Sequence, residues 1–321
     1  MLLAILATVV GLVVLAWSAD RFVEGASAVA RYLGMAPLLI GMVVIGFGTS
    51  APELVVSALA AADGSPQLAL GNALGSNTAN IGLILGVTAI LVPIAVSRGI
   101  LRRELPVLLG VTLLAGALLW DLSLSRVDAV VLILALVAVM FWLGWQAHKH
   151  PEDTLAEDVL EVTEAKHLSR KAAWSWLVVG LVVLVLASRL LVWGAVEIAS
   201  ALGWSELVIG LTVVAIGTSA PELASSIAAA RKGENDLALG NIIGSNMFNT
   251  LGVLGVAGLI APAAVGSEVL TRDLPVVLIL TAALVMFAVW PLGRGKINRG
   301  EGAVLLVAFA GYTAFLIGVA G

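Results

Sequence analysis

Long apolar runs, separated by short breaks that carry charge or contain Pro and Gly, cover almost the whole chain. A helix that crosses a membrane needs about 20 predominantly apolar residues, and these runs predict ten membrane-spanning helices. Their expected cores are residues 2–30, 36–62, 67–92, 104–120, 126–146, 172–200, 205–231, 236–261, 273–291 and 301–320. The first run is interpreted as a membrane helix and not as a signal peptide, because no basic residue precedes it. The predicted fold class is therefore an all-α polytopic membrane protein.

The composition agrees with this prediction. Hydrophobic residues make up 60% of the 321 positions and charged residues only 12%. That is about half the charged share of a soluble domain, which argues against a soluble globular enzyme. Cysteine is absent, so disulfides, thiol catalysis and thiolate metal sites are excluded. Residues 147–171 carry many charges and all three histidines, and we interpret them as an aqueous linker; a small regulatory or metal-sensing loop is the alternative.

The chain contains an internal repeat at a constant offset of 169 residues. The segment GTSAPEL at Gly48–Leu54 recurs unchanged at Gly217–Leu223. LALGNALGSN at Leu68–Asn77 matches LALGNIIGSN at Leu237–Asn246 in eight of ten positions. A register held without gaps over such a length indicates duplication of a whole structural unit.

This repeat predicts how the chain is organised. The first five-helix repeat is expected at residues 1–146 with its motif at 41–86, and the second at 172–321 with its motif at 210–255. The charged linker 147–171 joins them. Because five is odd, the second repeat must be inverted in the membrane. Inverted repeats are typical of secondary transporters, whose substrate site lies near the membrane midplane.

Basic residues predict the orientation, since Lys and Arg gather in cytoplasmic loops. If the linker is cytoplasmic, thirteen basic residues lie at cytoplasmic ends, namely Arg31, Arg98, Arg102, Arg103, Lys149, Lys166, Arg170, Lys171, Arg231, Lys232, Arg294, Lys296 and Arg299. The outside loops then hold only Arg126 and Arg272. We therefore expect a cytoplasmic linker and both termini outside.

Two carboxylates are expected near the middle of predicted spans, Glu53 in the second and Glu222 in the seventh. An ionisable side chain at that depth costs about 3 kcal/mol on insertion scales and marks a functional site by default. A Thr and a Ser precede each Glu by four and three positions, which places them on one helical face. These residues are Thr49, Ser50, Thr218 and Ser219. The intervening Pro lacks an N–H and disturbs the helix, so both helices are expected to break there and offer carbonyl oxygens.

The third and eighth predicted spans add a polar stripe of Asn, Ser and Asn at i, i+4 and i+8. The two stripes are Asn72, Ser76 and Asn80, and Asn241, Ser245 and Asn249. Glycine pairs on the same spans predict faces where helices approach closely. These are Gly71 with Gly75 and Gly240 with Gly244. Each stripe is expected to face the carboxylates.

The assembled site offers only oxygen ligands. Hard cations prefer oxygen, and Ca²⁺ takes six to eight oxygens from carboxylates, carbonyls and amides. Two carboxylates neutralise one Ca²⁺, and the same oxygens could hold several Na⁺. Zinc, copper and iron are disfavoured, because no His or Cys occurs in any predicted span.

The two motifs resemble the paired alpha repeats of the sodium/calcium exchanger family in the cation/calcium antiporter superfamily. GTSAPE followed by GN and GSN occurs twice, and the resemblance covers nearly the whole chain. It implies an antiporter, not an enzyme, that exchanges Ca²⁺ for Na⁺ by alternating access without a cofactor. The short linker resembles compact prokaryotic members, which implies the inner membrane. Inorganic cations and the bilayer are the implied partners, with no nucleic acid, and a monomer suffices because both repeats lie in one chain.

The resemblance also implies roles for single residues. Glu53 and Glu222 are implied as the central ion ligands. Further oxygens are implied from Thr49, Ser50, Thr218 and Ser219, with Ser76 and Ser245 completing outer sodium sites and Asn80 at the centre. Asn249 stands where several members carry Asp, which leaves ion stoichiometry and sodium dependence open.

Three alternatives follow from the same residues. An antiporter of this fold could exchange Ca²⁺ for H⁺ or require K⁺, because both glutamates can carry protons. A cation channel is a remote alternative, since two buried acids in inverted copies suit occlusion better than a pore. An intramembrane serine protease would need a base near Ser50 or Ser219, yet every histidine lies in the linker.

Overall fold

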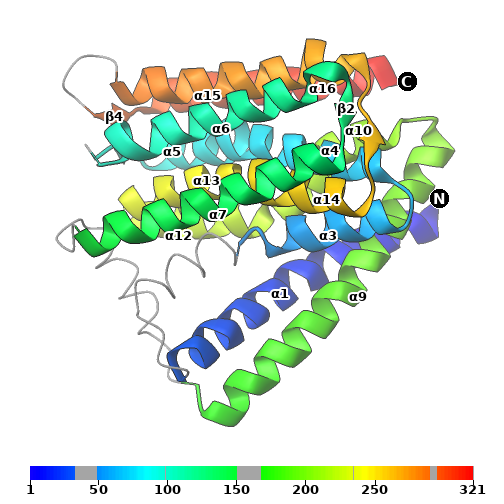
Figure 1. The fold of residues 1–321 in the computed structure, drawn as a ribbon, viewed down its shortest axis with the longest axis horizontal. Coiled ribbons are helices and arrows are strands. Elements are labelled where there is room, and N and C mark those ends of the chain that lie inside the picture. The colour runs from blue at the N-terminus through cyan, green and yellow to red at the C-terminus, as the bar shows by residue number, and fades with distance from the viewer. Residues whose placement is uncertain (33–48, 98, 150–167, 234, 290–294, 321) are drawn as a thin grey trace.

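The computed structural model describes residues 1–32, 49–97, 99–149, 168–233, 235–289 and 295–320, and most of them are helical (Figure 1). The α-helices are α1 (Leu2–Tyr32), α3 (Ala51–Ala62), α4 (Pro66–Thr78), α5 (Gly86–Leu91), α6 (Leu105–Leu118), α7 (Arg126–Lys149), α9 (Arg170–Leu202), α10 (Glu206–Ile209), α11 (Ala215–Thr218), α12 (Ala220–Lys232), α13 (Asn235–Phe248), α14 (Leu254–Ile260), α15 (Leu274–Val289) and α16 (Arg299–Ala320). The π-helical turns are η1 (Ala79–Leu85), η2 (Ile100–Glu104), η4 (Gly210–Val214), η5 (Asn249–Val253) and η6 (Val269–Asp273), and η3 (Leu119–Asp121) is a 3-10 turn. The strands are β1 (Ile94–Ala95), β2 (Ser123–Leu124), β3 (Ala263–Ala264) and β4 (Lys296–Ile297).

Within these residues, seven helical segments are long and apolar enough to cross a membrane, or up to eight if the bent pair Glu206–Thr218 and Ala220–Arg231 is one span. The seven are Pro66–Leu91, Ile100–Asp121, Arg126–Leu143, Arg170–Ile198, Asn235–Ile260, Val269–Val289 and Arg299–Val319. Leu2–Ser18 and Ala51–Ala62 are shorter apolar segments. Residues 36–48 of the second predicted span and 150–167 of the predicted linker lie outside the described residues. A helical membrane protein is confirmed, and the count of ten spans stays a prediction.

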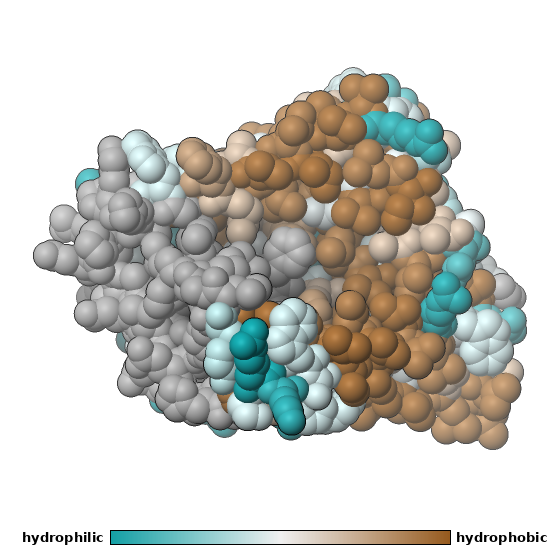
Figure 2. Space-filling view, turned by 60° about the horizontal axis from the view of Figure 1, so that its bottom comes forward, coloured by the Kyte–Doolittle hydropathy of each residue, from teal (hydrophilic) through white to brown (hydrophobic). Residues whose placement is uncertain are grey.

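The outer surface is apolar over large areas. Figure 2 shows brown, hydrophobic residues covering much of the described part of one face. Large apolar side chains such as Leu134, Phe141 and Val307 are exposed along the helices. Contiguous exposed apolar surface of this extent marks contact with a membrane or another protein, and helices of spanning length make lipid the natural solvent for it.

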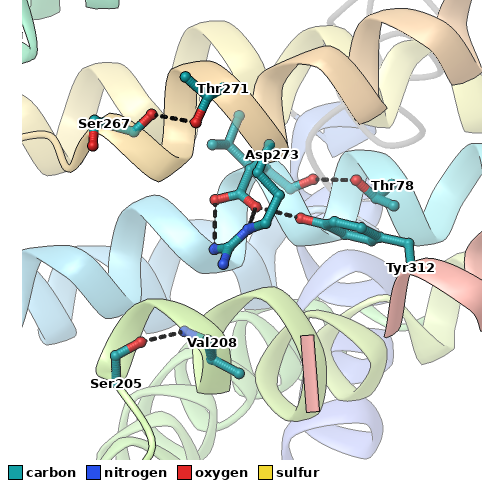
Figure 3. Close-up of polar contacts among 9 residues, drawn as sticks. Thr78, Ser205, Val208, Ser267, Thr271, Asp273 and Tyr312 are labelled. Carbon is teal, nitrogen blue, oxygen red and sulfur yellow. Dashed lines mark hydrogen bonds and ion pairs between the residues drawn. The ribbon is translucent and has the colours of Figure 1, made fainter. Parts of the chain in front are cut away.

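Helix starts are encoded locally, where the first backbone N–H groups of a helix need acceptors. Ser205 Oγ accepts a hydrogen bond from Val208 N (3.3 Å) at the start of α10 (Figure 3). Ahead of α7, Ser125 Oγ accepts from Asp128 N (3.2 Å), and the Asp128 carboxylate accepts from Ser125 N (2.8 Å). This reciprocal pair is the arrangement of a capping box.

The long helices α1 and α9 pack against each other along their length and run obliquely to the other helices (Figure 1). Glycines allow this close approach: a Cβ added at Gly180 would lie 2.5 Å from Phe22 N, and one at Gly194 would lie 2.7 Å from Ala4 O. Gly11 and Gly25, the positions equivalent to them in the first repeat, make matching approaches to α9. Because protein interiors are close-packed, any larger residue there would force the two helices apart.

Short strands join the two repeats, because each pair contains one strand from each repeat. β1 pairs antiparallel with β4, and β2 pairs antiparallel with β3. Ile94 in β1 and Ala263 in β3 are 169 residues apart and thus occupy equivalent repeat positions. Each of them pairs with a strand from the other repeat. The sequence analysis predicted no strand, because two residues are too few to show an alternating pattern.

A buried carboxylate of η6 is paired within its own turn and hydrogen-bonded to α16. Asp273 is 0% exposed, and its carboxylate accepts from Arg272 Nε (2.6 Å) and Nη2 (3.1 Å). Tyr312 of α16 points to the same carboxylate and donates its hydroxyl hydrogen to Asp273 Oδ1 (2.6 Å; Figure 3). A buried carboxylate requires such partners, since an unpaired charge in an apolar interior is costly.

Replacing Tyr312 with Phe is expected to lower stability by about 1.5–3 kcal/mol, because hydrogen bonds to charged groups contribute that much. The readout is a lower thermal unfolding midpoint in detergent. Tyr32→Phe is the matched control: its hydroxyl donates to Leu168 O (2.7 Å) at an exposed position, where water replaces the bond and the change stays within about 0.5 kcal/mol. Equal midpoints for Tyr312→Phe and the unsubstituted protein would contradict a stabilising role.

Candidate cation-binding site

The helix of the second motif is interrupted shortly before its glutamate, and the described helix of the first motif begins shortly before its own. Ser219 separates α11 from α12 with a bend of 41°, and Thr49 and Ser50 form a turn from which α3 begins at Ala51. The first helical bond in α3 and in α12 runs to the serine carbonyl, from Leu54 N (3.1 Å) and from Leu223 N (3.2 Å). The predicted break at the second Ser–Ala–Pro–Glu segment is confirmed. A break at the first stays a prediction, because the residues before Thr49 lie outside the described ones.

The two carboxylates are fully buried and are held by the opposite repeat. Glu53 and Glu222 are each 0% exposed. Ser219 Oγ donates to Glu53 Oε1 (2.9 Å), and Ser50 Oγ donates to Glu222 Oε1 (3.3 Å). The two halves of the site therefore interlock, with each motif supplying a hydroxyl to the carboxylate of the other.

Asparagines of α4 and α13 lie next to the carboxylates. Each of them accepts a hydrogen bond from the motif of the opposite repeat. Thr218 Oγ1 donates to Asn72 Oδ1 (3.2 Å), and Thr49 Oγ1 donates to Asn241 Oδ1 (3.2 Å). Thr49 Oγ1 also lies 3.3 Å from Ser245 Oγ, which in turn donates to Glu222 Oε1 (3.5 Å). The structure thus brings together both motifs with Asn72 of α4 and with Asn241 and Ser245 of α13.

Two further serines hold these asparagines and were missed in the sequence analysis. Asn72 Nδ2 donates to Ser57 Oγ (2.9 Å), and Asn241 Nδ2 donates to Ser226 Oγ (3.0 Å). Both serines follow their glutamate by four positions and so share its helical face. That spacing is the signal that could have identified them.

Several buried polar atoms in this region have no hydrogen-bond partner among the described residues. They are Glu53 Oε2, Glu222 Oε2, Ser76 Oγ and the side-chain amide atoms of Asn80 and Asn249. Each of these residues is 0% exposed. A buried polar group without a partner costs about 1–3 kcal/mol, and nearly all such groups in proteins are satisfied. Oxygens left free in this way suit a bound cation.

Asn80 and Asn249 lie within π-helical turns, η1 and η5. The sequence analysis expected ordinary helix with an even i, i+4, i+8 stripe. A π turn shifts side chains relative to that spacing and recurs at functional sites. The structure shows no hydrogen bond joining Ser76, Asn80 or Asn249 to the carboxylates within the described residues. Their place in a shared ion site therefore stays a prediction.

The repeats share a sequence pattern but differ in how their motif helices are covered. α9 packs along α3, whereas α1 makes only slight contact with α12. Accordingly Ala51 of α3 is buried and its counterpart Ala220 of α12 is exposed. The core cluster containing Val56 includes many α9 side chains, whereas the cluster around Ala229 of α12 includes none from α1 among the described residues.

The predicted close approach at the glycine faces is described for the first repeat. A Cβ added at Gly75 would lie 2.6 Å from Leu211 Cα, so α4 approaches the second repeat closely there, as predicted. A Cβ added at the counterpart Gly244 would meet nothing within 4 Å among the described residues, but Met42, the position equivalent to Leu211, lies outside them. A close helix approach at Gly244 therefore stays a prediction.

Comparisons with known proteins agree with these observations. The family model described as sodium/calcium exchanger protein matches residues 3–145 and 172–318. The putative antiporter CaxA of Alkalimonas amylolytica is 48% identical over 98% of this chain and 99% of its own length. The inner membrane protein YrbG of Escherichia coli (strain K12) is 42% identical over 98% of this chain and 97% of its own.

A solved structure supports the same assignment. The sodium-calcium exchanger NCX_Mj, soaked with Na⁺ and Ca²⁺, has a TM-score of 0.65 to this protein, with 32% identity over 98% of each chain. The match therefore extends over the helical fold and not only over the motifs. The chain belongs to the sodium/calcium exchanger family of membrane antiporters.

Proposed function

We propose that this protein exchanges Ca²⁺ for Na⁺ across the membrane by alternating access at one site, which contains Glu53 and Glu222. The observation that carries the proposal is the reciprocal bonding of the two carboxylates. Ser219 holds one oxygen of Glu53 and Ser50 holds one oxygen of Glu222, which leaves Oε2 of each carboxylate without a described protein partner. Two carboxylate oxygens from opposite repeats are then available to one shared cation.

The ligand set proposed for Ca²⁺ and Na⁺ combines these carboxylates with neighbouring hydroxyl, carbonyl and amide oxygens. Its members are Glu53, Glu222, Thr49, Ser50, Thr218, Ser219, Ser76, Ser245, Asn80 and Asn249. All are oxygen donors of the kind that hard cations take. The transport cycle follows from their burial: closing apolar surface over an uncompensated dianion is costly, so the cavity closes when cations neutralise it.

The proposed architecture is ten helices in two inverted five-helix repeats, 1–146 and 172–321, joined by a cytoplasmic linker at 147–171. Three observations support it. The hydrogen bonds of the two motifs are reciprocal, the strands pair across the repeats, and the basic residues are distributed unevenly between predicted loops. The distinct packing of α3 and α12 is the difference expected when an inverted pair is open on one side only.

Exchange for H⁺, or a requirement for K⁺, is the second candidate. Asn249 favours it, because a neutral amide there leaves the site with fewer negative charges to hold several Na⁺. The proposed location is a prokaryotic inner membrane with both termini outside, and one chain supplies both halves of the site.

The decisive measurement is uptake of ⁴⁵Ca²⁺ into proteoliposomes loaded with Na⁺, beside vesicles loaded with K⁺ and vesicles with a proton gradient. Uptake is expected to require internal Na⁺, because the outward Na⁺ gradient supplies the energy for Ca²⁺ entry. Uptake driven by the proton gradient alone would replace Na⁺ by H⁺ as the counter-ion. No uptake under any gradient by folded protein would contradict Ca²⁺ as the substrate.

A further inference from the structure

We propose that Ser225 is a cation ligand on the route that ions take between Glu222 and the membrane face at the C-terminal end of α12. The route to the opposite face has no equivalent ligand. The inference rests on the proposed exchange function and adds a step outside its ligand set. It makes the two access routes chemically different, although the two motifs share their GTSAPEL sequence.

Ser225 lies on an exposed face of α12. Ala220, Ala224 and Ser225 are all exposed, whereas Glu222 and Ser226 on the same helix are fully buried. The exposed face therefore begins within one helical turn of the buried carboxylate. Figure 1 shows α1 running obliquely to the other helices, consistent with its slight contact with α12.

The hydroxyl of Ser225 is bonded directly to the site. It donates to Glu222 O (3.2 Å) and accepts from Asn241 Nδ2 (2.8 Å). Asn241 in turn accepts from Thr49 through its Oδ1. A continuous hydrogen-bonded path therefore leads from an exposed hydroxyl to the centre of the site.

The remaining bonding capacity of this hydroxyl suits a cation. A serine hydroxyl has one donor hydrogen and two acceptor lone pairs. The two bonds to Glu222 O and Asn241 Nδ2 use the hydrogen and one lone pair, and no bond to the second is present among the described residues. An oxygen held in place by two bonds, with a lone pair free, can replace one water of an arriving Na⁺ or Ca²⁺.

The first repeat has no such oxygen. The position equivalent to Ser225 is Val56, which is 0% exposed and packs in the cluster formed with α9. Asn72, the counterpart of Asn241, donates to Ser57 Oγ and to Glu53 O. The hydroxyl of Ser225 therefore has no equivalent in the first repeat and is not part of the repeated motif.

The first test measures access, and it benefits from the absence of cysteine in the chain. Ser225→Cys is expected to react with a membrane-impermeant, cationic thiol reagent from the face to which α12 leads. The matched control, Val56→Cys, is expected to react about tenfold more slowly from that face, because a buried thiol is inert. Added Ca²⁺ should slow the reaction of Ser225→Cys. Equal rates for the two variants, or no protection by Ca²⁺, would overturn the proposal.

The second test separates a ligand from a residue that only positions Asn241. Membrane vesicles of opposite orientation give the KM for Ca²⁺ on each face. Ser225→Ala is expected to raise the KM about three- to tenfold on the α12 face only, as expected for loss of one neutral ligand. Ser226→Ala removes a buried hydroxyl that also binds Asn241 and is expected to change both faces alike.

An equal KM change on both faces for Ser225→Ala would show a positioning role and overturn the proposal, as would no change on either. The unsubstituted protein, run in the same vesicles with a Na⁺ gradient, tests the exchange function separately. Loss of Ca²⁺ uptake in that control would overturn the proposed function, whereas normal uptake with a symmetric Ser225→Ala effect would overturn only the role of Ser225.

Discussion

Glu222→Gln is expected to reduce Na⁺-driven Ca²⁺ uptake by at least about 100-fold, because only one carboxylate would remain to neutralise a buried Ca²⁺; a 100-fold loss corresponds to about 2.8 kcal/mol. Gln keeps the shape of the side chain and still accepts the hydrogen bond from Ser50, so the loss isolates the charge. Glu53→Gln is expected to have the same effect, since Ser219 holds it in the mirrored way. The measurement is ⁴⁵Ca²⁺ uptake by equal amounts of reconstituted protein.

Stability separates loss of the site from loss of the fold. Removing a buried charge relieves a desolvation cost, so both variants are expected to unfold in detergent at the same temperature as the unsubstituted protein or higher. Glu206→Gln serves as the control: its carboxylate accepts from Ser65 (3.1 Å) at the start of α10, and near-normal uptake is expected. Uptake by folded Glu222→Gln above about a tenth of normal, a cost below 1.4 kcal/mol, would contradict the proposed site.

The second large effect is expected at Gly75. A Cβ added there would lie 2.6 Å from Leu211 Cα, so α4 has no room for a side chain against the second repeat. Gly75→Val is therefore expected to lower the unfolding midpoint in detergent and the maximal exchange rate, since overpacking costs about 1–3 kcal/mol.

Gly110→Val is the matched control for that prediction. Gly110 lies on an exposed face of α6, and a Cβ added there meets nothing within 4 Å among the described residues, so a near-normal unfolding midpoint and exchange rate are expected. Unfolding midpoints and maximal exchange rates of both variants, measured side by side, test the difference. Equal values for Gly75→Val and Gly110→Val would contradict a close approach at Gly75.

The sequence was sufficient for the parts of the protein that repeat. Glu53 and Glu222, with the Thr and Ser ahead of each, could be identified because a carboxylate in an apolar run has few structural explanations. Ser57 and Ser226 were within reach of the same reasoning, since they follow each glutamate by four residues. The helix break at Ser219 followed from the proline chemistry.

The parts that were missed depend on contacts between distant segments. The π turns at Asn80 and Asn249 arise in runs whose composition also suits ordinary helix. Exposure of Ser225 and burial of Val56 depend on where α1 and α9 lie. The local sequence around the two residues does not predict how these distant helices pack. A glycine such as Gly75 predicts only that close approach is allowed, and which segment packs against it depends on the fold.

The crossed strand pairs bear on whether half of this chain could fold alone. Among the described residues, β1 pairs with β4 and β3 pairs with β2, so each half supplies the partner for a strand of the other. A single half-length polypeptide would expose those strand edges and would lack the serine that donates to its carboxylate. Each half therefore depends on the other for both its fold and its site.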